Sequence, residues 1–139
     1  MTTSLAMDVA QLREFLKQEF PQTSIVVDDV GEGWIKVRQA IELKHLRPGN
    51  TVSGPSLMAV ADVALYAAIL AIKGPVALAV TTNLNINFLR KPRADKDIIG
   101  DCRLIKVGKR LVVGEVFIYS NGDAEAVAHV TATYSIPPS

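Results

Sequence analysis

The chain has 139 residues, of which 49% are apolar and 21% are charged, and its formal net charge is +1. These values fit one globular domain with a sizeable core, which we expect to span residues 1–139. The near-neutral charge gives no indication of a nucleic-acid partner.

The single cysteine, Cys102, excludes an internal disulfide and is compatible with a reducing cytoplasm. The chain does not open with a basic segment followed by an apolar one, so no signal peptide is predicted. The apolar run at 57–72 is shorter than a membrane span and contains Asp62, so we expect no membrane segment. The sequence therefore predicts a cytoplasmic protein.

The first third of the chain predicts one helix, two strands and a loop. Apolar residues recur at helical spacing over 7–19, which predicts an amphipathic helix. A β-branched run at 24–30 and an alternating segment at 35–43 predict two strands, joined by a glycine-containing turn at 31–33. The proline and glycine of segment 45–53 predict a loop.

Segment 54–73 predicts the longest helix of the chain. It consists mostly of alanine and leucine, and Pro55 stands in the first turn, where a missing N–H costs nothing. Lys73 and Gly74 are typical of a helix end. The segment is apolar on nearly every side, so we expect the helix to be buried. One carboxylate, Asp62, stands in its middle.

The second half of the chain predicts an antiparallel meander. Its alternating segments are 77–89, 98–107, 111–119 and 126–134. The pair Asn121-Gly122 lies between the last two and favours a type I′ turn.

Together these elements predict an α+β architecture. An antiparallel sheet with one apolar face needs a cover, and only segment 54–73 is apolar enough to provide it. We therefore expect five to six antiparallel strands wrapped around one long buried helix, plus an amphipathic helix at the N-terminus. The sheet edges and the outer side of the long helix would still need a partner, which favours a homodimer.

Three segments of the chain carry a resemblance to a known fold. They are Ser53-Gly54-Pro55 followed by Asp62, the run Thr81–Pro92, and the turn Val107–Arg110. They resemble the hotdog fold, and within it the PaaI-like acyl-CoA thioesterases, which are relatives of the phenylacetyl-CoA and hydroxybenzoyl-CoA thioesterases.

The resemblance covers roughly residues 24–136 and implies both an activity and an assembly. It implies hydrolysis of an acyl-CoA or aryl-CoA thioester to the free acid and coenzyme A, by a homodimer or a dimer of dimers. The family often has His-Gly-Gly where this chain has Ser53-Gly54-Pro55. The histidine is therefore missing, whereas Gly54 matches the glycine whose N–H serves the family as oxyanion donor.

Asp62 is the first candidate catalytic residue. A carboxylate among apolar neighbours is costly unless it is paired, hydrated or used. As a catalytic group it would be the general base that activates water, or the nucleophile that forms a mixed anhydride, and burial would increase its basicity. Alternatively, Asp62 is a structural residue whose oxygens are satisfied by Ser, Thr or backbone donors.

Gly54 is the second candidate, because a helix N-terminus presents free N–H groups to a developing oxyanion. Alternatively, Gly54 is a plain capping glycine beside Pro55, which is the commoner role. Gly54 and Asp62 are eight residues apart, which is about 12 Å along one helix at 1.5 Å per residue. Within one chain, the two residues therefore cannot both contact the same thioester. If both are catalytic, the site must lie between two subunits.

Further residues of the long helix are candidate substrate contacts. Met58 and Tyr66 share the face of Asp62 at one-turn spacing and could line an acyl or aryl pocket, although simple packing is the commoner role. Ser53 and Ser56 could contact the thioester, although a helix cap is the simpler function for Ser53.

The strand after the long helix and two basic segments supply the remaining candidates. The resemblance places polar residues near the site at this strand, which here are Thr82, Asn83 and Asn85, although cross-strand or solvent-facing roles are the simpler functions for them. Arg and Lys side chains suit the phosphates of coenzyme A, although a solvated basic rim is common. The cations considered for this role are Arg90, Lys91, Lys106, Lys109 and Arg110, and Arg90 belongs to the family-like segment.

The sequence gives no reason to propose a metal or a redox cofactor, so coenzyme A is expected only as part of the substrate. His45 and His129 are isolated in the sequence, and we expect no histidine near the start of the long helix. Two alternatives remain open. One is a non-catalytic acyl-CoA-binding or regulatory hotdog module, and the other is a hotdog dehydratase or hydratase, which would pair a histidine with an acidic residue.

Overall fold

The structure is a computed structural model. It describes residues 5–138, so residues 1–4 and 139 of the predicted domain lie outside the described part. The helices are α1 (Val9–Glu19), the short 3-10 helix η1 (Leu43–His45) and α2 (Gly54–Lys73). The strands are β1 (Val26–Gly31), β2 (Trp34–Gln39), β3 (Leu46–Arg47), β4 (Thr51–Val52), β5 (Val80–Phe88), β6 (Ile98–Val107), β7 (Leu111–Ser120) and β8 (Ala128–Ser135).

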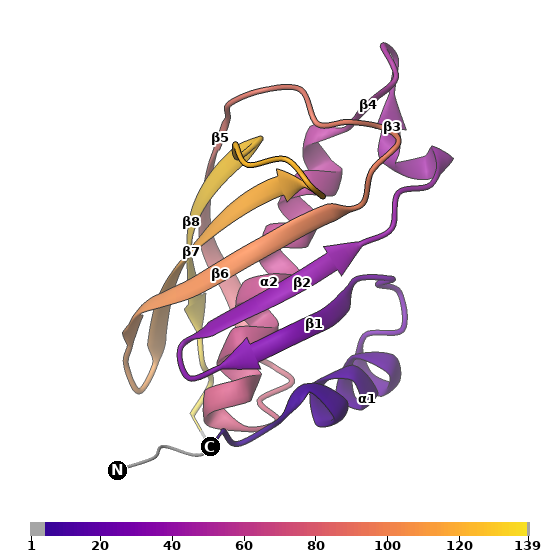
Figure 1. Cartoon of the computed structure of the whole chain (residues 1–139). Helices are drawn as coiled ribbons and strands as arrows, with labels where there is room; N and C mark the ends of the chain where they lie inside the picture. The colour runs from indigo at the N-terminus through magenta and orange to yellow at the C-terminus, as the bar shows by residue number, and fades with distance from the viewer. Residues whose placement is uncertain (1–4, 139) are drawn as a thin grey trace.

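Six strands form one sheet that curves around α2 (Figure 1). Their order is β1-β2-β6-β7-β8-β5, and every neighbouring pair is antiparallel. Strands β3 and β4 form a separate two-stranded ribbon before α2. The predicted α+β hotdog architecture, with its N-terminal helix, is confirmed.

Helix α2 begins and ends where the sequence predicts. The Ser53 side chain caps its N-terminus, and Gly74 follows its last residue with a positive φ of 88°. By length and hydropathy α2 could cross a membrane, but most of its residues are buried inside this fold.

The burial of α2 differs between its two halves. Residues 63–71 are buried on all sides, whereas Pro55, Met58 and Ala59 are exposed. Within a single chain α2 is therefore buried as predicted in its C-terminal half, and its N-terminal half leaves part of its surface uncovered.

Two local predictions are wrong. The strand predicted at 35–43 ends at Gln39, which is buried and whose side-chain amide donates hydrogen bonds to Ser24 Oγ and to the Ala40 carbonyl. The turn before β8 is not type I′, which needs two positive φ angles. Of its central residues only Gly122 has one.

Gly100 allows β6 to lie close to α2. A Cβ at this position would lie 2.9 Å from Val60 Cγ1 and 3.0 Å from Val37 Cγ2. We expect Gly100→Ala to lower the free energy of unfolding by about 1–3 kcal/mol, because the extra methyl overpacks the core. Urea unfolding measures this, and the exposed Asn121→Ala serves as the control. Equal unfolding midpoints for the two variants would contradict the prediction.

Strand β5 contains a bulge that decides which of its side chains face α2. Thr81 pairs with Tyr134 and Asn83 pairs with Thr133, so Thr82 is the extra residue. Beyond the bulge, the even-numbered apolar residues of β5 lie opposite buried residues of β8. Simple alternation would put Thr82 on that same face, but the bulge puts Thr81 there instead.

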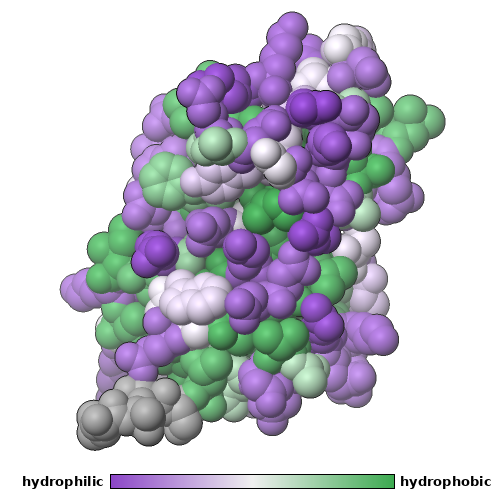
Figure 2. Space-filling view, viewed as in Figure 1, coloured by the Kyte–Doolittle hydropathy of each residue, from purple (hydrophilic) through white to green (hydrophobic). Residues whose placement is uncertain are grey.

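The two faces of the sheet differ in character. Residues on the face toward α2 are buried, as the alternating burial of β7 and β8 shows. Figure 2 shows the outer face as a mainly hydrophilic surface with scattered apolar residues. Strand β5 stands at one edge of the sheet, and its residues are exposed or half-buried.

Candidate active site

Asp62 lies on α2 opposite the start of β5 and the end of β8. The Thr81 hydroxyl donates a hydrogen bond to its Oδ1, and the Tyr134 hydroxyl donates to the same oxygen at 2.9 Å. Asp62 is half-buried in the single chain. Two hydroxyl groups offset the cost of its partial burial.

Tyr134 remains a hydrogen-bond donor under ordinary conditions. Burial, and then the nearby Asp62 carboxylate, raise the pKa of its hydroxyl far above the usual range. The phenol therefore keeps its proton at any pH at which the protein works.

Two neighbouring recesses of about 420 and 460 Å³ reach Asp62. Phe20 and Gln22, which follow α1, line both of them. The smaller recess extends toward the start of α2, where it includes His45, Ser53 and Ser56. The larger one includes Glu19, Tyr66, Ala77, Thr81 and Tyr134.

Tyr66 forms part of the wall of the larger recess. Its hydroxyl donates to the Ala77 carbonyl at 3.1 Å, and its ring packs against Phe20 and Tyr134. Burial raises the pKa of this hydroxyl, with Glu19 adding to the effect. The structure thus brings Tyr66 close to Asp62, whereas Met58 is 39% exposed and lines neither recess.

Ser53 and Ser56 form the N-terminal cap of α2. Ser53 Oγ accepts from the Ser56 N–H at 3.3 Å, and the two hydroxyl oxygens are 2.8 Å apart. Ser56 Oγ also donates to the His45 carbonyl at 3.3 Å. Both hydroxyls thus have a structural function, and the predicted cap by Ser53 is confirmed.

His45 lies beside the start of α2, so the expectation of no histidine there is wrong. Its carbonyl accepts from the Ser53 N–H at 2.8 Å, and its Nδ1 accepts from the Glu42 N–H at 2.9 Å. Because Nδ1 is an acceptor, the proton of the neutral ring is on Nε2. The ribbon of β3 and β4 folds the chain back and brings His45 into the recess of Asp62.

Gly54 lies in another recess, of about 610 Å³, which does not include Asp62. The Phe88 ring covers Gly54, since a Cβ there would lie 3.1 Å from Phe88 Cζ. Arg47, Arg90 and Lys91 also line this recess. The Gly54 N–H is at the helix N-terminus, where backbone donors have no intrahelical partner.

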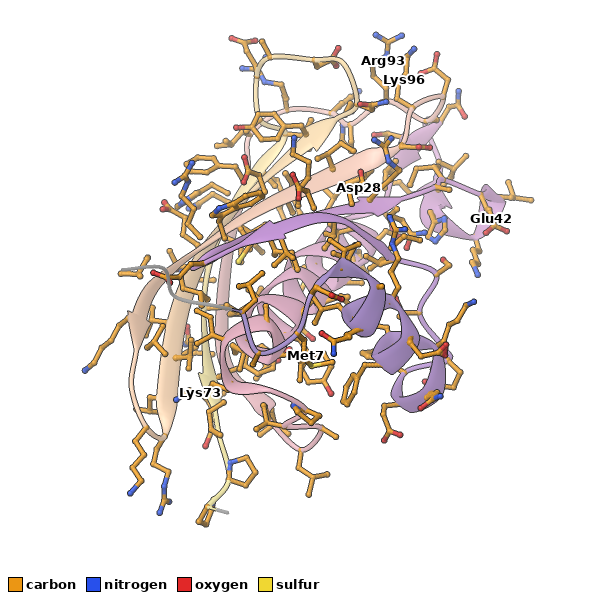
Figure 3. All side chains as sticks on the ribbon, turned by 60° about the horizontal axis from the view of Figure 1, so that its bottom comes forward. Met7, Asp28, Glu42, Lys73, Arg93 and Lys96 are labelled. Atoms are coloured by element: carbon orange, nitrogen blue, oxygen red, sulfur yellow. The ribbon has the colours of Figure 1, made fainter. Side chains whose placement is uncertain are left out.

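The predicted phosphate contacts do not come together within one chain. Arg90 pairs with Glu125 at 2.8 Å and lines the Gly54 recess beside Lys91. Lys109 and Arg110 lie in the β6–β7 turn. The strand register puts that turn beside the start of β5, at the opposite end of the sheet from Arg90. Figure 3 shows that the length of the molecule separates these two ends. Lys73 is labelled near the end with the β6–β7 turn, and Arg93 is labelled near the end with Arg90.

Thr82 and Asn83 do not contact Asp62. The Thr82 hydroxyl donates to the Thr133 carbonyl at 3.2 Å, and Asn83 is exposed. The contact is made by Thr81, which the sequence interpretation did not select and which the bulge at Thr82 turns toward α2. Tyr134 was recognised only as an apolar-face residue of the last strand.

Comparison with protein families identifies the chain. The family model described as the thioesterase superfamily matches residues 49–127, which is more than half of the chain. The chain belongs to the thioesterase superfamily. This family match and the sheet around α2 confirm the resemblance to hotdog thioesterases.

Solved structures agree with this assignment. A candidate thioesterase from Silicibacter sp. TM1040 shares 45% identity, covers 97% of this chain and 95% of its own, and superposes with a TM-score of 0.90. Zebrafish thioesterase superfamily member 2 shares the fold at 16% identity, with coverage of 94% and 99% and a TM-score of 0.83. The PaaI protein of the E. coli phenylacetic acid degradation operon shares it at 19% identity, with coverage of 91% and 96% and a TM-score of 0.74. The comparison with curated proteins gives no match.

Proposed function

We propose that this thioesterase hydrolyses an acyl-CoA or aryl-CoA thioester at two equivalent sites of a homodimer. Each site combines the Gly54 N–H of one subunit with Asp62 of the other. Family membership supports the reaction class. The observation that carries the shared site is that Gly54 and Asp62 line separate recesses within one chain.

The edge strand β5 supports this assembly. It is nine residues long and contains no proline or lysine, so nothing in it blocks pairing with another strand. At its start Thr81 donates a hydrogen bond to Asp62, and at its end the Phe88 ring covers Gly54. If two copies of β5 pair antiparallel about a two-fold axis, the end of each strand lies beside the start of the other.

Such a dimer would bring further groups together. The basic β6–β7 turn of one subunit lies at the start of its β5, and would therefore approach Arg90 of the other subunit. The exposed residues Pro55, Met58 and Ala59 of α2 would be covered by the second copy. We further expect two dimers to form a tetramer in the cytoplasm, and light scattering measures the mass of the assembly.

The proposed reaction uses water and two protein groups. Asp62 takes a proton from water as the oxygen attacks the thioester carbonyl, and the Gly54 N–H stabilises the oxyanion. The intermediate collapses, the C–S bond breaks, and the coenzyme A thiolate takes the proton from Asp62. If Asp62 were instead the nucleophile and water attacked the Asp62 carbonyl of the mixed anhydride, a single turnover in heavy-oxygen water would label its carboxylate.

The rival function is a module that binds acyl-CoA without hydrolysing it. A panel of acyl-CoA substrates with a thiol-release readout separates the two functions. The protein suits this assay, because Cys102 is its single cysteine and is buried. Burial raises the pKa of that thiol to about 12, so its reactive thiolate is scarce. Tight binding without turnover across the panel would favour the module.

Arg90 is expected to contribute to recognition of coenzyme A. We expect Arg90→Ala to raise KM for an acyl-CoA by about three- to tenfold, since a half-exposed cation contributes modestly to phosphate binding. KM for a short acyl-pantetheine thioester, which lacks the nucleotide phosphates, should change less. The control is Arg103→Ala, on the outer face of the sheet. Equal increases for both substrates would contradict the assignment.

A further inference from the structure

We propose that Tyr134 is a positioning residue for the hydrolysis. Together with Thr81 it fixes Oδ1 of Asp62 and leaves Oδ2 as the atom that takes the proton from the attacking water. This inference rests on the proposed function, because it assigns separate tasks to the two oxygens of the proposed base.

The hydrogen bonds around Asp62 are unequally divided between its oxygens. Both hydroxyl donors, from Thr81 and Tyr134, reach Oδ1. Oδ2 has no hydrogen-bond donor among residues 5–138, which are those that the structure describes. A carboxylate oxygen that accepts two hydrogen bonds has fewer lone pairs left for a proton, so the free oxygen is the better base.

The single hydroxyl hydrogen of Tyr134 has two acceptors within reach. Its oxygen lies 2.9 Å from Oδ1 and 3.2 Å from the Asp62 carbonyl oxygen. That carbonyl is within α2, where it already accepts the N–H of the residue four positions later. The shorter contact is to the charged group, so the hydrogen bond to Oδ1 is the stronger one.

The donors are held in place by the sheet. Thr81 and Tyr134 are register partners on the neighbouring strands β5 and β8. The bulge at Thr82 therefore puts both side chains at the same position along the strands and on the same face of the sheet. Tyr134 is 3% exposed and its ring packs against Tyr66, with ring centroids 6.1 Å apart. The carboxylate therefore cannot rotate freely and exchange its two oxygens.

The hydrolysis moves one proton from water to Oδ2 and then to the leaving thiolate. The water oxygen forms a bond to the thioester carbon while one of its protons moves to Oδ2. When the C–S bond breaks, its electron pair leaves with sulfur, and the proton on Oδ2 passes to that thiolate. Oδ1 keeps both hydrogen bonds throughout, so neither hydroxyl has to reorient during the reaction.

Three variants test the positioning function by steady-state kinetics on an acyl-CoA that the wild type hydrolyses. We expect Tyr134→Phe and Thr81→Val each to lower kcat by at least about tenfold, the effect of losing one hydrogen bond to a charged group. KM should stay within about twofold, because neither hydroxyl is assigned a contact with substrate. Thr81→Ser, which keeps the hydroxyl, should retain most of the wild-type kcat.

A double variant and an outer-face control complete the design. Because both donors serve the same oxygen, the loss of kcat in Tyr134→Phe/Thr81→Val should differ from the product of the single losses. Tyr119→Phe removes a hydroxyl from the opposite face of the sheet and should leave kcat unchanged.

The outcomes separate this inference from the function on which it rests. If the wild type hydrolyses no thioester in the panel, both fail. If the wild type is active and Asp62→Asn is inactive, but Tyr134→Phe and Thr81→Val keep the wild-type kcat, only the positioning inference is overturned. A change confined to KM, or equal losses in Thr81→Val and Thr81→Ser, would overturn it as well. If Tyr134→Phe does not fold, the comparison of Thr81→Val with Thr81→Ser decides alone, because Thr81 is exposed.

Discussion

Replacing Asp62 by asparagine is expected to lower kcat for acyl-CoA hydrolysis by about 10²–10⁴-fold, the range typical of a general base. The amide oxygen of the introduced side chain can still accept the hydrogen bonds from Thr81 and Tyr134, so the local structure should persist. Its amide nitrogen would stand in place of the second oxygen and cannot take a proton. The thiol-release assay at saturating substrate measures the loss.

A matched control for this variant is Asp101→Asn. Asp101 is a half-buried carboxylate on the outer face of β6, away from both recesses of Asp62. It should leave kcat unchanged, while thermal unfolding shows that both variants are folded. If Asp62→Asn retained kcat within about threefold of the wild type, Asp62 would not be the base or the nucleophile.

Removing the N–H of Gly54 is expected to have the second-largest effect. Gly54→Pro should lower kcat by about 10²–10³-fold, as the loss of an oxyanion donor does in other hydrolases. A proline is tolerated in the first turn of a helix, and Ser53 has the extended conformation that suits a residue before proline. Gly54→Ala is the control, because it adds a Cβ against Phe88 but keeps the N–H. Equal losses of kcat in both variants would contradict the oxyanion function.

Mixed dimers then test whether the site is shared. A heterodimer of Gly54→Pro and Asp62→Asn subunits would have one site with both groups intact and one with both groups lost. Random pairing in equal amounts should therefore give about a quarter of the wild-type activity, although each parent alone is nearly inactive. If the co-expressed and purified mixture is no more active than its parents, the two groups belong to the same chain's site or to none.

The sequence predicted best what depends on local chemistry. The bounds of α2 were predictable because its serine cap, first-turn Pro55 and terminal Gly74 are signals that act within a few residues. The strands were predictable from alternation, because each buries only one face. Strand β2 ends at Gln39, whose buried side chain donates to Ser24, a tertiary contact that no local pattern reveals.

The candidate site was predictable only in part, because its parts meet through long-range contacts. Asp62 and Gly54 were found from their places on one helix. Thr81 was missed because a bulge reverses the alternation, and His45 because the β3–β4 ribbon folds the chain back. The half-burial of Asp62 follows from its place beside an edge strand that a single chain leaves uncovered.

The bulge at Thr82 makes the site sensitive to chain length as well as to residue type. Whether a strand residue faces α2 depends on whether its position is odd or even, and one extra residue before the apolar part of β5 reverses this relation for Val80 and Thr81. A homologue could keep both threonines and every apolar residue of β5 and still lose the Asp62 contact through a single deletion at the bulge. Relatives of this enzyme are therefore best compared by counting the residues between the carboxylate and the apolar part of β5. The same residue types can occur with Thr81 on either face of the sheet, so residue types alone do not show whether the contact with Asp62 exists.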